Sequence, residues 1–312
     1  MEKEFDFTPT EDQFGVFWKY LMQPEVTGVN YSNGMLWITD LSRGRDPVQD
    51  VVTDKFLTQF ANTIANSANK HFSSADPVLE ADTRDLRISI LHPSIARTGM
   101  AISLRKSPPV LRHTEESLIA SGFCSREVLN LLINCVKAKL VIVFGGEPEA
   151  GKTELAKFMM QYIDPADRVI TIEDSLELHY GEINSGHDCL ELQIRDGFDY
   201  KAAIKTSLRQ DPRWLMLSEA RSSEVVSLLE SWSTGIAGFT TIHLDDVRKL
   251  PDRVRNMMED KKDVERLENR IYSDVNVGVL IRMRTEADGS IRRYLDQLCF
   301  YTRENGENHM NL

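Results

Sequence analysis

The chain has 312 residues, of which 41% are hydrophobic and 27% charged, and its formal net charge is −11 at pH 7. This composition is typical of a soluble globular protein with one large domain or two ordinary ones. The acidic balance disfavours nucleic acid as the main ligand, because a broad nucleic-acid-binding surface is basic. No run approaches about 18 apolar residues, so no direct membrane span is expected.

The four cysteines are scattered and none forms a C-x-x-C pair, so a zinc ribbon is not expected. Reduced thiols in the core of a cytosolic protein are the favoured interpretation, with a disulfide as the alternative. The N-terminal sequence MEKEFDFTPTEDQ is acidic and lacks the apolar segment of a secretory signal.

Residues 1–112 are predicted to form a small α+β domain. Its strongest local signal is Asn33-Gly34, which lies within alternating sequence and favours a hairpin because both turn residues tolerate positive φ. Two prolines, Pro108 and Pro109, then indicate a linker. The expected elements are helices at 12–22 and 54–72, the hairpin at 26–40, and strands at 85–93 and 99–106.

Residues 113–312 alternate apolar strands with amphipathic helices. This alternation predicts a mostly parallel sheet that is covered by helices on both faces. The expected helices lie at 126–139, 153–163, 200–210 and 222–234; the expected strands lie at 140–146, 167–174, 213–220 and 238–243, with a closing hairpin over 274–284 and 291–302.

A phosphate-binding loop of the form GxxxxGKT separates the first of these strands from its helix. Main-chain N–H groups of such a loop and the helix N-terminus would hold phosphates. Lys152 would meet the β- and γ-phosphates and Thr153 would ligate Mg²⁺; the alternative is an ordinary strand–turn–helix with an exposed lysine. The residues expected around the nucleotide are Gly146, Glu147, Pro148, Glu149, Ala150, Gly151, Lys152, Thr153 and Glu154.

Three glutamates, Glu147, Glu149 and Glu154, lie in or beside this anion-binding loop. The architecture tolerates them, since the main chain holds the phosphates. A carboxylate that faced the nucleotide at about 6 Å would cost roughly 3 kcal/mol at an effective dielectric near 20. The sequence therefore predicts a genuine loop, and the orientation of its glutamates decides how strongly it binds nucleotide.

Carboxylates end two further strands, at the sheet edge where open α/β sheets bind ligands. Glu173 and Asp174 end one strand and are suited to orienting water or holding Mg²⁺ through water; the alternative for Asp174 is a helix N-cap. Glu219 ends another strand and suits a Mg²⁺ and water site, the alternative being a surface pair with Arg221. His243 ends a third strand and is either structural or a sensor of the γ-phosphate.

Four stretches in this order, GGEPEAGKT, ITIEDSLEL, LRQDPRWLMLSEAR and TGIAGFTTIH, resemble the Walker A loop, Asp box, Walker B segment and His box of the secretion traffic ATPases. That superfamily includes type IV secretion and conjugation motors, type II secretion ATPases, Tad pilus ATPases and pilus retraction motors. The length and the absence of a tetracysteine module resemble its compact conjugation-type branch. The resemblance implies a RecA-like P-loop domain that hydrolyses ATP with Mg²⁺.

The resemblance also implies roles for single residues. Glu173 would orient or activate the attacking water and Glu219 would act on Mg²⁺ and water, although the two roles are interchangeable. In the N-terminal domain, DLRISILHPSIARTGMAISLRK is similar to the strand pair that carries phosphate-reaching arginines in this superfamily. The matching residues are Arg87, Arg97 and Arg105, of which Arg105 fits best.

By the same resemblance, the expected assembly is a homohexameric ring with nucleotide between the two domains. The chain would be a cytoplasmic motor, held peripherally at the inner face of the membrane by secretion or pilus components. Two alternatives remain: a nucleotide-binding scaffold subunit that hydrolyses little or no ATP, and a nucleic-acid motor, which the acidic balance disfavours.

Overall fold

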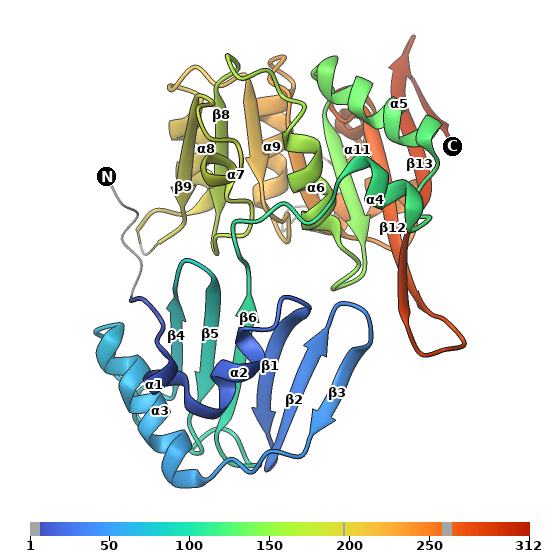
Figure 1. Cartoon of the computed structure of the whole chain (residues 1–312). Helices are drawn as coiled ribbons and strands as arrows, with labels where there is room; N and C mark the ends of the chain where they lie inside the picture. The colour runs from blue at the N-terminus through green and yellow to red at the C-terminus, as the bar shows by residue number, and fades with distance from the viewer. Residues whose placement is uncertain (1–6, 196, 258–263) are drawn as a thin grey trace. The chain divides into compact units, whose positions relative to one another are not determined.

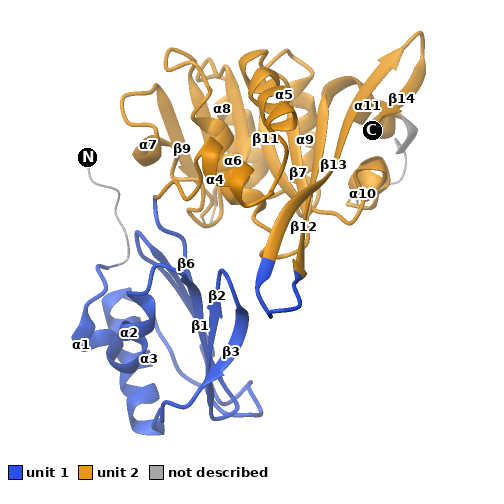
Figure 2. Ribbon diagram, turned by 45° about the vertical axis from the view of Figure 1, so that its right-hand side comes forward, with its two compact units in different colours: residues 1–109, 285–291 blue, residues 110–284, 292–312 orange. Residues whose placement is uncertain are grey.

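The computed structural model describes residues 7–195, 197–257 and 264–312, which divide into two compact units (Figure 1; Figure 2). Unit 1 contains residues 1–109 and 285–291, and unit 2 contains residues 110–284 and 292–312. Residues 1–6, which begin the segment predicted not to be a secretory signal, lie outside the described residues. The functional division into 1–112 and 113–312 stays a prediction.

Unit 1 is built on a six-stranded sheet in the order β3-β2-β1-β6-β5-β4, with every neighbouring pair antiparallel. The predicted hairpin at Asn33-Gly34 is confirmed, with φ of 51° and 75° at the two turn residues. The strands are β1 Val26–Ser32, β2 Met35–Asp40, β3 Gly44–Val48, β4 Val78–Asp82, β5 Leu86–Leu91 and β6 Ala101–Lys106.

Helices supply the apolar layer that packs on this sheet. α3, Asp54–Ser67, buries Phe60 and Ile64, as its 3.6-residue period predicts. It ends before residue 72, and Asn69 follows it with a φ of 52°. The predicted helix over 12–22 is broken at Gly15, whose φ is 47°. Its pieces are α1 Glu11–Phe14, η1 Gly15–Phe17 and α2 Trp18–Leu21.

Unit 2 is built on an eight-stranded sheet in the order β14-β13-β12-β7-β11-β10-β8-β9. Strands β12, β7, β11, β10, β8 and β9 pair in parallel, as the alternating pattern predicts, whereas β13 and β14 are antiparallel. The strands are β7 Ile142–Gly146, β8 Val169–Glu173, β9 Cys189–Gln193, β10 Trp214–Leu217, β11 Phe239–His243, β12 Val277–Thr285, β13 Ile291–Glu304 and β14 Glu307–Asn311.

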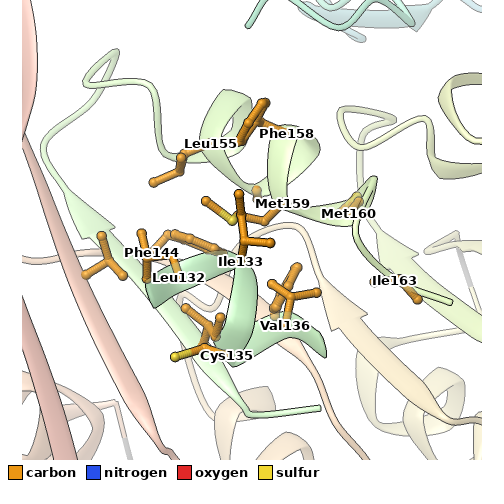
Figure 3. Close-up of a cluster of buried hydrophobic side chains, with 14 of the residues drawn as sticks. Leu132, Ile133, Cys135, Val136, Phe144, Leu155, Phe158, Met159, Met160 and Ile163 are labelled. Carbon is orange, nitrogen blue, oxygen red and sulfur yellow. The ribbon is translucent and has the colours of Figure 1, made fainter. Parts of the chain in front are cut away.

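Two buried apolar clusters, one containing residues of α5 and α6 and the other residues of α8, α9, α10 and α11, form the core of unit 2. In the first, Phe144 of β7 lies among Ile133 of α5 and Met159 of α6, so the strand and the helix that flank the phosphate loop share one core (Figure 3). The helices are α4 Glu115–Ala120, α5 Arg126–Lys137, α6 Lys152–Met160, α7 Tyr180–Ile183, α8 Tyr200–Ser207, α9 Glu224–Trp232, η2 Val247–Lys249, α10 Leu250–Asn256 and α11 Val264–Asp274.

The chain's four cysteines, Cys124, Cys135, Cys189 and Cys299, all lie in the described residues, and none is joined in a disulfide. Within residues 7–195, 197–257 and 264–312, no helix is long and apolar enough to cross a membrane.

Candidate nucleotide-binding site

The C-terminal ends of four neighbouring parallel strands of unit 2 form the site. In the sheet, β7, β11, β10 and β8 are adjacent in that order. Parallel strands point the same way, so the residues at their C-terminal ends meet along one edge. The order of strands therefore puts Lys152 beyond β7, then His243 on β11, Glu219 beyond β10 and Glu173 on β8. These are the residues that the sequence analysis selected.

The loop between β7 and α6 has the backbone that its glycines allow. Gly146 has a φ of 153°, and a Cβ atom there would lie 2.5 Å from the carbonyl oxygen of Ile281. Gly151 has a φ of 97° and precedes the first residue of α6. Both positions thus favour glycine on backbone grounds, and the loop delivers its main chain to the N-terminus of α6, where anions bind favourably.

Lys152 is folded back over this loop and is only 7% exposed. Its ammonium group donates hydrogen bonds to the carbonyl oxygens of Gly146 at 3.1 Å and Glu147 at 2.8 Å. It also lies 3.5 Å from Nδ1 of His243. The lysine is therefore buried at the loop on which phosphates would bind.

His243 connects the lysine to the carboxylate beyond β10. Its Nε2 atom lies 2.8 Å from Oε1 of Glu219, on the side of the ring opposite the lysine contact. The histidine side chain is 42% exposed, so it is accessible to a ligand as well. The structure brings Lys152, His243 and Glu219 together, as the sequence analysis expects of a nucleotide site.

Arg221 joins the two strand-end carboxylates. Its guanidinium donates to Oε2 of Glu219 at 3.0 and 2.7 Å and to Oδ2 of Asp174 at 2.9 Å. The hydrogen bonds to Glu219, together with the negative charges of Glu219 and Asp174, raise the pKa of Arg221. The surface pair that the sequence offered as the alternative for Glu219 is thus present, and it also includes Asp174.

Glu173 is fully buried rather than facing the edge of the sheet. One of its oxygens accepts hydrogen bonds from the main-chain N–H groups of Glu177 at 3.2 Å and Leu178 at 2.9 Å. Burial raises the pKa of this carboxyl group to about 8, despite the opposing effect of those two hydrogen bonds. Glu173 therefore fixes the turn that follows β8.

That turn presents a carboxylate that the sequence analysis missed. The Thr153 hydroxyl donates a 3.3 Å hydrogen bond to Oε2 of Glu177. Thr153 is the residue predicted to ligate Mg²⁺, so Glu177 lies directly beside the predicted cation position. The available signal was the second glutamate of the EDSLEL stretch, four residues beyond Glu173.

The acids of the loop differ in their surroundings. Glu147 and Glu149 are exposed, whereas Glu154 is partly buried in the first turn of α6. Glu154 lies 3.5 Å from the ammonium of Lys157 and 3.7 Å from the guanidinium of Arg112. Its charge is therefore compensated by neighbouring cations and by the helix N-terminus.

The predicted phosphate-reaching arginines belong to unit 1. Arg87 of β5 and Arg105 of β6 are direct cross-strand partners, so their side chains share one face of the sheet. Arg97 lies in the connection at the other end of this strand pair and is exposed. Whether any of them reaches the nucleotide stays a prediction.

The described residues contain no group of three or more His, Cys, Asp or Glu side chains arranged to hold a metal ion by themselves. Mg²⁺ at a phosphate loop does not need such a group, because it keeps water ligands and uses phosphate oxygens with one or two protein groups. The hydroxyl of Thr153 and the nearby carboxylates of Glu219, Asp174 and Glu177 fit that kind of shared coordination.

Comparisons with known proteins agree with this geometry. A model of the family described as "Type II/IV secretion system protein" matches residues 74–304. An uncharacterized protein of Bacillus anthracis is 25% identical over 295 residues, which cover 90% of this chain and 66% of that protein. The probable conjugal transfer protein TrbB of Sinorhizobium fredii is 24% identical over 221 residues, 68% of this chain and 65% of that protein. The chain thus spans slightly under two thirds of the length of these relatives.

Among solved structures, the ATPase DotB of Yersinia pseudotuberculosis superposes with a TM-score of 0.68 at 16% identity, over 93% of this chain and 80% of that one. At this identity the likeness concerns the fold. The predicted fold is confirmed: a RecA-like P-loop domain with a mostly parallel sheet follows a smaller α+β domain. The predicted resemblance to secretion ATPases is confirmed as well.

Proposed function

Because the chain belongs to the type II/IV secretion system protein family, we propose that it is an ATP-hydrolysing motor of a secretion, conjugation or pilus system. The observation that carries this proposal is the connected series from Lys152 through His243 to Glu219. A lysine of a phosphate loop, a polar sensor and a strand-end carboxylate are the groups that phosphoryl transfer to water requires around its substrate.

Binding begins at the loop. Main-chain N–H groups of the loop over residues 146–153, Pro148 excepted, and the N-terminus of α6 take the phosphates, and Lys152 exchanges its carbonyl acceptors for phosphate oxygens. Mg²⁺, when bound, neutralises charge on the β- and γ-phosphates. Thr153 and Glu219 would hold it, with Asp174 acting through water. This replacement of carbonyl oxygens by phosphate oxygens needs little movement of the Lys152 side chain, because its ammonium group is already at the loop.

Glu177 and Glu219 are the carboxylates best suited to orient the attacking water. Glu173 has the wrong protonation state for a base near neutral pH, because burial keeps it protonated up to about pH 8. It acts instead as a positioning residue that holds the main chain of Glu177. His243, which contacts both Lys152 and Glu219, reports the presence of the γ-phosphate to the carboxylate.

The motor works as a homohexameric ring, in which residues 1–112 and 113–312 are the two domains that move relative to each other. Arg105, with Arg87 beside it, contributes positive charge to the nucleotide from the N-terminal domain. The ring operates in the cytoplasm and is attached peripherally to the membrane by components of its secretion or pilus machine. These statements rest on the family and on the cross-strand pairing of the two arginines.

A nucleotide-binding scaffold with little turnover is the second candidate. Both oxygens of Glu219 already have a neighbour, Arg221 or His243. A carboxylate held in this way favours nucleotide binding without activation of water. Phosphate release decides between the two: the motor releases phosphate over many turnovers per chain, whereas the scaffold binds ATP without sustained release. Stimulation of release by single-stranded DNA would instead indicate a nucleic-acid motor. Light scattering with and without ATP measures the mass of the assembly and so tests for the hexameric ring.

A further inference from the structure

The most unusual backbone in the phosphate loop occurs at an acid. Glu149 has a φ of 64°, a left-handed conformation that side chains other than glycine, asparagine and aspartate seldom adopt. Its side chain is exposed, so no buried contact of the carboxylate explains the conformation. Some other group must hold the main chain at this position.

Arg293 of β13 is the group that touches it. Its Nε atom donates a 2.9 Å hydrogen bond to the main-chain carbonyl oxygen of Glu149, across 144 residues of sequence. The stem of the arginine follows the loop, since a Cβ atom added to Gly151 would lie 3.6 Å from Cδ of Arg293. Arg293, Glu149 and Gly151 all belong to unit 2, so this contact lies within one compact unit.

Charge supports the same pairing. Arg293 is partly buried, and burial lowers the pKa of its guanidinium, while the nearby Glu149 carboxylate raises that pKa in part. An arginine beside the loop also offsets the negative charge that Glu149 adds to an anion site. One side chain thus holds the carbonyl and compensates the carboxylate of the same residue.

We propose that Arg293 is a positioning residue for nucleotide binding, which holds the turn at Glu149 in the conformation that receives phosphates and offsets its acidic side chain. The inference deepens the proposed function and rests on it for the identity of the ligand. It also explains how a chain with glutamate at a position suited to glycine retains a working loop.

The neighbouring Arg292 is a matched control. It is also an arginine of β13, but it donates to the carbonyl oxygen of Gly122 at 3.1 Å and is exposed. Replacing either arginine with glutamine removes one charge from the same strand. The change at position 293 removes the hydrogen bond to the Glu149 carbonyl oxygen, whereas the change at position 292 removes the one to Gly122.

The first experiment measures binding of a fluorescent ATP analogue and, without nucleotide, the hydrogen exchange of the amides of residue 147 and residues 149–153. Arg293→Gln is expected to weaken binding by about tenfold, the loss typical of one charge-assisted hydrogen bond. The same substitution should accelerate hydrogen exchange in the loop, and it should raise KM for ATP more than it lowers kcat. Arg292→Gln should leave all of these values near those of the wild type.

The second experiment repeats the substitution in a Glu149→Gly background. Glycine adopts positive φ without strain and carries no charge, so it needs no arginine. The effect of Arg293→Gln on binding should then fall to less than about threefold, because interacting residues are not additive. An equal loss in both backgrounds, or an equal loss from Arg292→Gln, would overturn the proposal.

Arg293→Lys keeps the charge but lacks the Nε donor, and it carries the test if Arg293→Gln does not fold. Wild-type binding and loop exchange in the lysine variant would contradict the proposal, and weakened binding with faster exchange would support it. If the wild-type chain binds no ATP analogue at all, the proposed function fails. The exchange rates of the loop with and without the arginine then still decide whether Arg293 holds it.

Discussion

The hydroxyl of Thr153 donates a hydrogen bond to the carboxylate of Glu177 across 3.3 Å. Thr153 lies in the first turn of α6, directly after the phosphate loop. Glu177 lies in the turn that Glu173 holds by accepting hydrogen bonds from two main-chain N–H groups. Glu173 and Glu177, which are four residues apart, therefore have different roles. Glu177 lies beside the residue predicted to ligate Mg²⁺, whereas the buried Glu173 supports the turn from the core.

Matched amide substitutions separate these roles. Glu177→Gln should lower the rate of ATP hydrolysis by about a hundredfold, the usual contribution of a group that directs proton transfer, with little change in nucleotide affinity. Glu173→Gln should lower it by less than about tenfold, because a glutamine oxygen can still accept both N–H groups. Steady-state phosphate release measures both. The opposite ranking would return the water-activating role to Glu173.

The raised pKa of Glu173 makes stability depend on pH. Its pKa is about 8 in the folded protein against an ordinary value of 4.5, so the folded state holds the proton more tightly. The resulting stabilisation is complete below the ordinary pKa and is lost as the pH rises through about 8. Between about pH 5 and pH 8.5, the wild type should lose roughly 3–4 kcal/mol more unfolding free energy than Glu173→Gln. Urea titrations test this, and parallel pH profiles would contradict it.

Glu149→Gly should tighten binding of a non-hydrolysable ATP analogue. It removes an exposed charge, worth about 0.7–3 kcal/mol at 6 Å for dielectrics between water and protein surface. It also relieves a positive φ that costs glutamate about 1 kcal/mol. Glu149→Gln is the control, because it removes the charge and keeps the backbone requirement. Calorimetric titration gives both affinities, and unchanged values in both variants would rule out any detuning by this acid.

Arg105 tests the contribution of the N-terminal domain. Arg105→Ala should lower the rate at saturating ATP by at least about tenfold, or roughly 1.4 kcal/mol of barrier. Arg105→Lys should recover little, because an ammonium group lacks the planar fork of a guanidinium. Arg97→Ala tests the other candidate arginine, which lies in the connection at the other end of the strand pair. Turnover that is unaffected by both changes at Arg105 would remove this residue from the site.

Elements with a strong local signal could be predicted from the sequence. The buried strands β7, β8, β10 and β11 are short and rich in apolar and β-branched residues, and each ends at or near a residue selected for the site. The site residues could be predicted from these strands because the C-terminal ends of parallel strands meet at one edge of the sheet. The hairpin at Asn33-Gly34 was readable because its two residues permit positive φ.

Elements and residues that depend on distant partners were missed. Strand β9 is only half-buried along its length and carries polar residues, so its pairing with β8 left no clear pattern. Arg293 meets the loop only because β13 returns to the sheet, across 144 residues of sequence. Glu177 was visible as an acid, but its contact with Thr153 depends on the shape of a turn.

Phosphate release by the wild type and by Lys152→Ala tests the central claim most directly. The lysine ammonium donates to loop carbonyls at 3.1 and 2.8 Å and lies 3.5 Å from Nδ1 of His243. Circular dichroism and thermal unfolding measure whether the variant keeps its fold. The expected result is sustained ATP hydrolysis by the wild type and none above background in the folded variant. Hydrolysis by Lys152→Ala at the wild-type rate would mean that this loop is not the catalytic site.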